Sequence, residues 1–376
     1  MSPGSFKQLS TRLIQPEQKG VKAAMRSYHR ASSSMPLKDA GLVEFAAEDQ
    51  DTLAVLTEAL AEFSASDASP LAMRYDEDRK LLNLMSKLQR RLPSEAALRA
   101  RCRIGYDSKE DSSGEAEKDG WIPLAELFGE VGGTSIADYI LHRAYTLYLQ
   151  PIVQTNGSIV GYEFLTRSLP EQAPFRPAEL FETARKIGQH SFLDRAARLL
   201  AVRMGAAHLA PGMLRFVNFL PSSLHQPDAC LKCIFDAMRE TGTDPRDCVF
   251  EVMESEPLDD PRLPDVFSVY RKEGVRVALD DVGSGFATLD VVERLQPDYV
   301  KMDRRWVSRC DQDTDKQRYI DRLLERVSRF NGVVLAEGVE RLEEWNYLKQ
   351  AGVPLFQGYL FGRAAPVPIP APAAVL

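Results

Sequence analysis

Eight polar side chains in the second half of the chain stand at or near the ends of short apolar segments, where they could bind metal ions. They are Glu163, Asn218, Glu251, Asp280, Asp281, Lys301, Glu337 and Gln357. Five of the eight are carboxylates and two are carboxamides. Oxygen ligands without His or Cys are what hard divalent cations such as Mg²⁺ and Mn²⁺ prefer. The residue types therefore predict a metal centre.

The number of carboxylates indicates more than one ion. Five exceed what one divalent ion normally takes, so we expect two ions about 4 Å apart. Asp280 and Asp281, adjacent at one segment end, could bridge both ions. Two-metal centres typically activate a water molecule for in-line attack on a phosphodiester. Lys301 could orient or deprotonate that water, or stabilise the charge of the phosphate.

Each of these motifs has a more ordinary explanation when taken alone. Asp281-Val-Gly283 is typical of a turn, and Gln357-Gly-Tyr359 of a kinked strand. A Glu after an apolar strand often favours the dipole of the next helix. Lys301-Met-Asp303-Arg304 is typical of a surface ion-pair cluster. Their recurrence at nearly every segment end favours a shared functional site.

The segments that would position these side chains alternate between apolar runs and helical stretches. The runs are residues 148–153, 159–165, 215–219, 248–253, 275–279, 299–302, 333–336 and 355–361. This alternation predicts an α/β fold with a mostly parallel sheet. Eight strands predict a (β/α)₈ TIM-like barrel, in which the strand ends meet on the face that carries active sites. Since only residues 154–158 separate the first two runs, we expect an irregular antiparallel first strand.

The composition excludes several classes of protein. The chain has 376 residues, 44% hydrophobic and 27% charged, as in globular proteins. A net charge of −7 argues against a DNA or RNA polymer as partner, although metal ions could still hold an anionic substrate. We expect no membrane insertion and no secretory signal. Five scattered cysteines indicate reduced thiols and a cytoplasmic location.

Four regions are expected along the chain. In order, they are a flexible N-terminal arm (1–36), a mainly helical region (37–135), the barrel (136–366) and a Pro/Ala-rich tail (367–376). In the second region, apolar residues recur at helical spacing from Leu53 to Phe63 and from Leu81 to Leu88. Residues 121–147 predict a short helix pair around Gly132-Gly133. The helical region has no motif that reveals its role. We expect it to be a regulatory or dimerising module.

At these residues the sequence resembles the EAL-domain family of bacterial cyclic-di-GMP phosphodiesterases. The resemblance covers about Ile136 to Pro366, and Glu163-Phe-Leu-Thr-Arg167 is similar to the signature E-A-L-x-R, with Phe in place of Ala. The eight motifs, in order, begin at Gln150, Glu163, Val217, Glu251, Asp280, Pro297, Ala336 and Gln357.

The resemblance implies hydrolysis of cyclic-di-GMP to linear pGpG with two Mg²⁺ or Mn²⁺ ions. The implied metal ligands are Glu163, Asn218, Glu251, Asp280, Asp281 and Glu337. The implied catalytic residues are Lys301, Glu163, Glu337 and Glu254, the last steadying the loop after Asp281. The implied substrate-binding residues are Gln150, Leu165, Arg167, Glu340 and Gln357. A homodimer formed through the barrel is implied as well.

Two departures from the family pattern keep other functions open. Phe164 is larger than the usual Ala, although strand alternation directs it away from Glu163. The loop at residues 282–288 also differs from the usual sequence. No metal-ligand position is lost, so we predict an active phosphodiesterase. The first alternative is a weak or inactive cyclic-di-GMP receptor that uses the same pocket, and the second is a scaffold that binds neither metal nor nucleotide.

Overall fold

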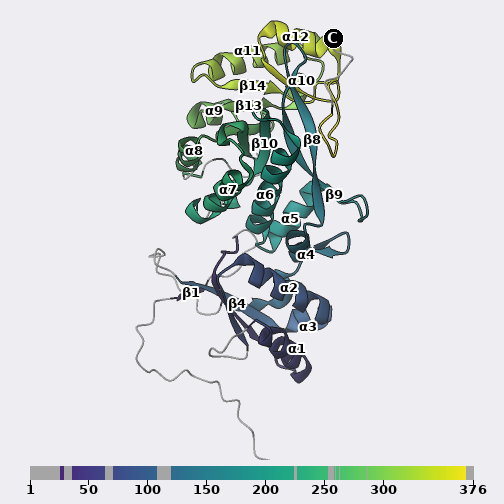
Figure 1. Cartoon of the computed structure of the whole chain (residues 1–376), viewed down its shortest axis with the longest axis vertical. Helices are drawn as coiled ribbons and strands as arrows, with labels where there is room; N and C mark the ends of the chain where they lie inside the picture. Colours follow the sequence, from purple (N-terminus) through teal and green to yellow (C-terminus); the bar gives the residue numbers. More distant parts are fainter. Residues whose placement is uncertain are drawn as a thin grey trace, which may run out of the picture.

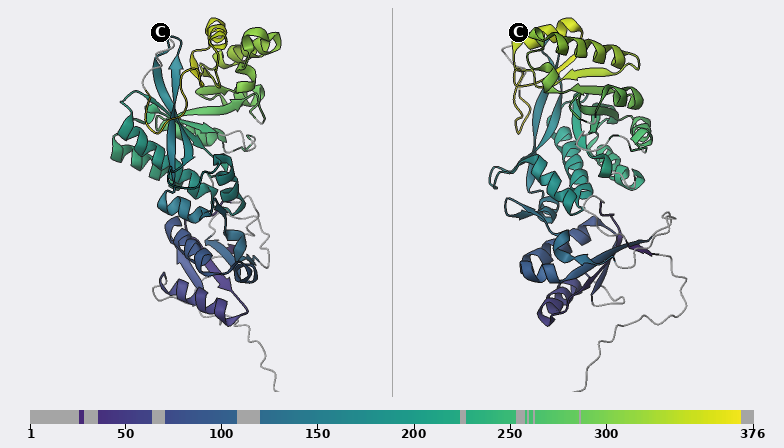
Figure 2. Two further views of the ribbon diagram at one scale, coloured as in Figure 1. Left: turned by 90° about the vertical axis from the view of Figure 1, so that its right-hand side faces the viewer. Right: turned by 180° about the vertical axis from the view of Figure 1, so that it is seen from behind.

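A barrel and an N-terminal module lie at opposite ends of the long axis of the computed structural model (Figures 1 and 2). The structure describes residues 26–28, 36–63, 71–107, 120–223, 227–252, 258, 260–261, 263–285 and 287–369. We use "N-terminal module" for the described residues before 136. Helices α4 (Ile136–His142) and α5 (Pro177–Lys186) lie between the module and the barrel (Figure 1).

Eight strands close the barrel in the order β10-β11-β12-β13-β14-β15-β8-β9. They are β8 (Tyr145–Gln154), β9 (Ile159–Ser168), β10 (Leu214–Phe219), β11 (Cys248–Val252), β12 (Arg276–Val282), β13 (Tyr299–Met302), β14 (Val333–Ala336) and β15 (Leu355–Gln357). Strands β9 to β15 are parallel, and β8 is antiparallel to both of its neighbours. The predicted TIM-like barrel with an antiparallel first strand is therefore confirmed.

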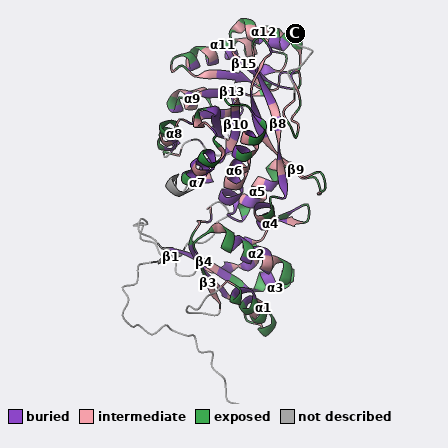
Figure 3. Ribbon diagram, in the orientation of Figure 1, coloured by how far each residue is buried: buried purple, intermediate pink, exposed green. Residues whose placement is uncertain are grey.

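Helices cover the outside of the barrel. They are α6 (His190–His208), α7 (Pro227–Thr241), α8 (Leu263–Lys272), α9 (Leu289–Leu295), α10 (Arg304–Val307), α11 (Thr314–Ser328) and α12 (Leu342–Ala351). Short 3₁₀ turns stand at Leu124–Leu127, Pro221–Ser223, Pro245–Asp247 and Cys310–Gln312. The barrel strands are largely buried, whereas outer helices such as α11 carry exposed residues (Figure 3). Among the described residues, no helix combines the length and apolar character needed to cross a bilayer.

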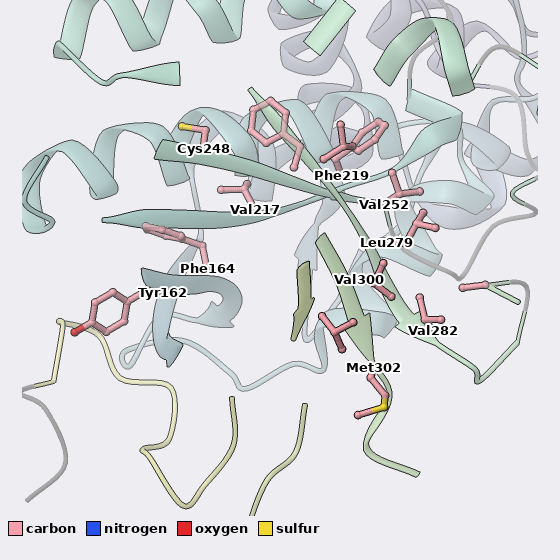
Figure 4. Packing of buried hydrophobic residues seen from close by; sticks show 14 of the residues in the cluster. Tyr162, Phe164, Val217, Phe219, Cys248, Val252, Leu279, Val282, Val300 and Met302 are labelled. Atoms are coloured by element: carbon pink, nitrogen blue, oxygen red, sulfur yellow. The ribbon is translucent and has the colours of Figure 1, made fainter. Parts of the chain in front are cut away.

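Strand residues that face outward pack against these helices in one large apolar cluster. Phe164, Val217 and Phe219 belong to it (Figure 4). Phe164 is 3% exposed, and its ring lies 3.4 Å from where a Cβ on Gly205 of α6 would stand. The expected orientation of Phe164, away from Glu163 and toward the helices, is confirmed.

The inside of the barrel is apolar directly below the predicted polar residues. Seven interior residues form this layer: Ile152, Phe216, Val249, Ala278, Tyr299, Leu335 and Leu355. Because side chains alternate along a strand, the residue two positions on faces the same interior. On β10 to β13 and β15, and just after β14, that residue is one of the predicted polar residues. On β8, which runs the opposite way, Gln150 lies two positions before Ile152.

The N-terminal module contains a sheet that the sequence prediction missed. Its antiparallel strands run in the order β1 (Arg26–Tyr28), β4 (Arg101–Asp107), β2 (Gly41–Ala46) and β3 (Ala72–Tyr75), and β5 (Ile122–Pro123) pairs with β4. The predicted helices are present as α1 (Gln50–Ala61), α2 (Asp78–Arg91) and α3 (Ser94–Arg99). The two longest of these strands, β2 and β4, escaped prediction because they pair with each other across a long stretch of chain.

Two further sequence expectations need correction. Gly132-Gly133 joins a hairpin, β6 (Glu130–Val131) and β7 (Thr134–Ser135). This hairpin stands between the 3₁₀ turn at Leu124–Leu127 and α4, so only the second of the two expected helices is an α-helix. Both glycines have a positive φ, 58° and 79°, which suits a tight hairpin turn. Strand β1 lies within the predicted flexible arm. The rest of the arm, apart from Pro36, and the tail beyond Ile369 fall outside the described residues.

The apolar core of the module continues into the helices next to the barrel. One cluster contains Leu82 and Met85 of α2, Tyr139 of α4, Leu180 of α5 and Phe192 of α6. The module and the first turn of α6 therefore share one core.

Replacing Phe164 with Ala should lower the free energy of unfolding by about 3–5 kcal/mol, because it empties a buried ring site. Urea denaturation followed by circular dichroism measures the change. Leu98, 62% exposed on α3, provides the control, and Leu98→Ala should change stability by no more than about 0.5 kcal/mol. A loss at Phe164 no larger than the control would contradict the packing described here.

Candidate active site

The carboxyl ends of the parallel strands bring the predicted polar side chains to one place. Glu163, Glu251, Lys301 and Gln357 are buried there. Asn218, Asp280, Asp281 and Glu337 are half-buried. Glu254 lies outside the described residues, so its predicted position is not located.

Lys301 occupies the centre of the carboxylate group. Its Nζ lies 2.6 Å from Glu251 Oε2, 2.8 Å from Asp280 Oδ1, 2.9 Å from Glu337 Oε1 and 3.2 Å from Glu163 Oε1. Burial alone would lower the pKa of Lys301, but the four carboxylates outweigh it and raise that pKa well above its ordinary value. Burial also raises the pKa of Glu251 and Glu337, and Lys301 only partly offsets this effect.

Two carboxamides, one on β15 and one on β10, hold Glu163 of β9. Gln357 Nε2 donates to Glu163 Oε2 at 2.5 Å, and Asn218 Nδ2 donates to Glu163 Oε1 at 3.4 Å. By contrast, Glu251 Oε1 and Gln357 Oε1 are buried oxygens without a hydrogen-bond partner. A buried acceptor without a donor is costly unless a ligand or cation satisfies it.

Two groups of three carboxylates share Asp280. The first consists of Glu163, Glu251 and Asp280, and the second of Asp280, Asp281 and Glu337. Within each group the oxygens lie within 4.8 Å of one another. Five carboxylates against one ammonium leave four negative charges, which two divalent cations would neutralise. The residues therefore fit two hard cations, with Asp280 placed to contact both.

An irregularity in β12 lets two consecutive Asp residues reach the same site. In a regular strand, the side chains of Asp280 and Asp281 would face opposite sides. Here the register with β13 shifts between Leu279 and Val282, and Asp281 has a φ of 52°. Asp and Asn tolerate this left-handed region better than other residues with a side chain.

Two stacked rings fix the loop that follows Asp281. Trp306 and Tyr319 stack with centroids 3.8 Å apart, and Trp306 Nε1 donates to the Gly283 carbonyl at 3.1 Å. Gly283 has a φ of 94°, and a Cβ there would stand 2.3 Å from both Trp306 Nε1 and Tyr319 Oη. The Gly283 N–H also donates to the Ala287 carbonyl at 2.9 Å. Residue 283 must therefore be Gly for Asp281 to keep its place.

The predicted substrate-binding residues line two cavities beside the carboxylates. One, of about 260 Å³, is lined by Gln150, Leu165, Glu340 and Gln357. The other, of about 250 Å³, is lined by Leu165 and Arg167. Glu163 and Leu165 lie on the walls of both.

Comparison with known proteins places this site in a family. The model of the EAL domain matches residues 135–364. The chain belongs to the EAL domain family. The sequence is similar to a protein of Escherichia coli (strain K12) named "Probable cyclic di-GMP phosphodiesterase PdeG", with 31% identity over 222 residues. That match covers 57% of this chain and 43% of the relative, so the chain spans less than half the length of this curated relative.

Solved structures of EAL proteins share the fold of this EAL domain. A standalone EAL protein from Vibrio cholerae O395, in its c-di-GMP bound form, has a TM-score of 0.53 and 28% identity. That match covers 59% of this chain and 92% of the other. Klebsiella pneumoniae BlrP1 in a manganese/cy-diGMP complex at pH 9.0 also has a TM-score of 0.53 and 28% identity, and the match covers 63% of this chain and 58% of BlrP1.

Sequence reasoning missed two side chains of this EAL domain that line the first cavity, Arg304 and Tyr359. Arg304 Nη2 lies 2.9 Å from Glu340 Oε1, and the Arg363 guanidinium lies 3.8 Å from the centre of the Tyr359 ring. Arg304 begins helix α10 just after β13. Its position three residues after Lys301, at the start of a helix that follows a barrel strand, is the signal that could have identified it.

Replacing Gly283 with Ala should displace Asp281 and weaken Mn²⁺ binding by about tenfold or more, since the new Cβ would collide with Trp306 and Tyr319. Gly212→Ala is the matched control, because Gly212 has a φ of 85° but open space around it. Calorimetric titration with Mn²⁺ and thermal unfolding compare the two variants. Equal Mn²⁺ affinity in both would contradict the assignment of this loop to the metal site.

Proposed function

We propose that this EAL domain hydrolyses cyclic-di-GMP to linear pGpG with two Mg²⁺ or Mn²⁺ ions. The observation that carries the proposal is the pair of carboxylate groups that share Asp280 around Lys301. Membership of the EAL family and the retention of each predicted metal-ligand position support it.

The two groups of carboxylates would each hold one ion, with Asn218 as a further ligand. Glu163, Glu251 and Asp280 would hold one ion, and Asp280, Asp281 and Glu337 the other. When bound, the ions supply a water of lowered pKa and stabilise negative charge on the phosphodiester. Gln357 keeps Glu163 oriented through its hydrogen bond. Lys301 contacts carboxylates of both groups, and from this position it would donate an N–H toward the attacking water or a phosphoryl oxygen.

The two cavities next to the metal centre would hold the nucleotide. Arg167 lines the cavity that also contains Asn218 and Asp280, so its guanidinium is placed to bind a phosphate near the ions. Gln150, Glu340 and Gln357 form a polar wall in the other cavity. Leu165 contributes apolar surface to both, which suits a purine ring.

A cyclic-di-GMP receptor without turnover is the second candidate. The contacts of Lys301 with four carboxylates favour it, because they compensate part of the buried charge without any metal ion. The two candidates differ in product formation, and the same assay separates them.

Purified protein incubated with cyclic-di-GMP should release pGpG when Mg²⁺ or Mn²⁺ is present, as measured by chromatography. EDTA should abolish the reaction. Ca²⁺ should support nucleotide binding but not turnover, because its looser coordination poorly serves a two-metal reaction. Tight binding with no pGpG after hours in Mn²⁺ would reject the hydrolase and favour the receptor.

Lys301→Met and Glu163→Gln should each lower turnover by about 10²-fold or more, since each removes charge from the reacting centre. Circular dichroism checks that both variants fold. Near-normal turnover in either folded variant would show that the site is misassigned.

Arg167→Ala should raise the Kd for cyclic-di-GMP in Ca²⁺ by about tenfold or more, because a charge-assisted bond to a phosphate is lost. Calorimetry measures the affinity. The control is Arg176→Ala, since the Arg176 side chain is 90% exposed. An equal effect of both substitutions would speak against a phosphate contact at Arg167.

A further inference from the structure

Helix α6 carries an arginine that ties it to the N-terminal module. Arg195 Nη1 lies 2.7 Å from Asp39 Oδ2, and its Nη2 lies 2.5 Å from Asp78 Oδ2. Asp39 precedes β2, and Asp78 is the first residue of α2. The Arg195 side chain is only 12% exposed, whereas the carboxylates are 29% and 25% exposed. The guanidinium therefore joins two separate segments of the module to α6.

The start of α6 is also embedded in the module. Phe192 and Leu193 belong to the apolar cluster that the module shares with α4 and α5. Ser191 Oγ donates to the Leu37 carbonyl at 3.2 Å, and Gln189 Nε2, just before the helix, donates to the Leu127 carbonyl at 3.1 Å. A displacement of the module would therefore act directly on this end of α6.

Asp194, the residue next to Arg195, contacts the barrel instead. Its Oδ1 accepts a hydrogen bond from the Leu220 N–H at 3.0 Å, and its Oδ2 accepts one from Ser223 Oγ at 2.8 Å. Leu220 is two residues beyond Asn218, the one uncharged residue among the predicted metal ligands. Because an amide oxygen attracts a cation less than a carboxylate does, the contribution of Asn218 depends strongly on its placement.

Arg198, one turn further along α6, extends this contact to the next strand. Its Nη2 lies 2.8 Å from Asp194 Oδ2, and its Nη1 donates to Tyr270 Oη at 3.2 Å. The guanidinium stands 5.7 Å from the centre of the Phe219 ring and 5.9 Å from that of Phe250. Phe219 follows Asn218, and Phe250 precedes Glu251. This buried ion pair therefore packs directly behind two predicted metal ligands.

We propose that α6 links the N-terminal module to the metal centre, so that docking of the module through Arg195 sets the placement of Asn218 and Glu251 through Asp194 and Arg198. The proposal rests on the metal site of the function proposed above. The two ends of the link differ in accessibility. Solvent reaches Asp39 and Asp78, so a signal can loosen that end, whereas the Asp194–Arg198 pair is enclosed and keeps its geometry. In this arrangement, Asp194 and Arg198 are positioning residues.

The input end is tested with the double variant Asp39→Asn/Asp78→Asn, which leaves the barrel sequence unchanged. Its Kd for Mn²⁺, measured by calorimetry without nucleotide, should rise by about fivefold or more. Arg195→Met should cause a similar rise, and the triple variant no further rise, because all three act through one contact. The control Glu58→Gln breaks a pair with Arg91 inside the module and should leave the Kd unchanged. A parental Kd in the double variant would overturn the link.

The output end is tested with Asp194→Asn, which should raise the Kd for Mn²⁺ by about tenfold. Removing one member of a buried pair can unfold a protein, so Asp194→Asn/Arg198→Met removes both charges together. A folded form of either variant with the parental Mn²⁺ affinity would overturn the positioning role. These measurements of Mn²⁺ affinity do not depend on turnover. If the variants bind Mn²⁺ more weakly but the parent chain forms no pGpG, the proposed link stands and the proposed hydrolase activity is rejected. A parent chain that binds no Mn²⁺ would overturn both.

Discussion

Five carboxylates gathered at one end of a barrel repel one another and lose hydration, and the ammonium of Lys301 is what makes their proximity tolerable. It contacts four of them at 2.6 to 3.2 Å from a buried position at the end of β13. Below it, the apolar layer that includes Phe216 and Leu335 fills the barrel and prevents the polar groups from sinking further inward. The charges are therefore confined to the mouth of the barrel, at the end where this fold carries active sites.

The same constraint explains how much of the site could be predicted from the sequence. On β10 to β13 and β15, and just after β14, an apolar interior residue precedes the polar one by two positions, and this spacing depends only on strand geometry. Glu251 and Lys301 could be located in this way without any knowledge of tertiary contacts. Gln150 follows the same logic with the direction reversed, because β8 runs antiparallel to its neighbours.

Features that depend on pairing between distant segments could not be predicted. Strands β2 and β4 of the module pair Phe45 with Cys102, across a stretch that contains three helices and another strand. The left-handed backbone of Asp281 accompanies the register shift against β13. This register shift cannot be recognised from the amino-acid composition of the loop. Arg198 resembles any helix-surface arginine in sequence, and only its tertiary neighbours Phe219, Phe250 and Tyr270 bury it. The fit of Phe164 beside Gly205 likewise depends on how closely α6 approaches the sheet.

Because the N-terminal module and the barrel helices share one apolar cluster, the domain defined by the family match differs from the unit that buries its own core. The family match begins at residue 135, which marks a unit of inheritance. The surface of that unit includes Leu180, Phe192 and Leu193, which are covered in this chain by residues such as Leu82 and Met85. A chain that began at residue 135 would leave this apolar surface to water. The smallest piece of this chain that buries its own core is therefore larger than the piece that the family match defines.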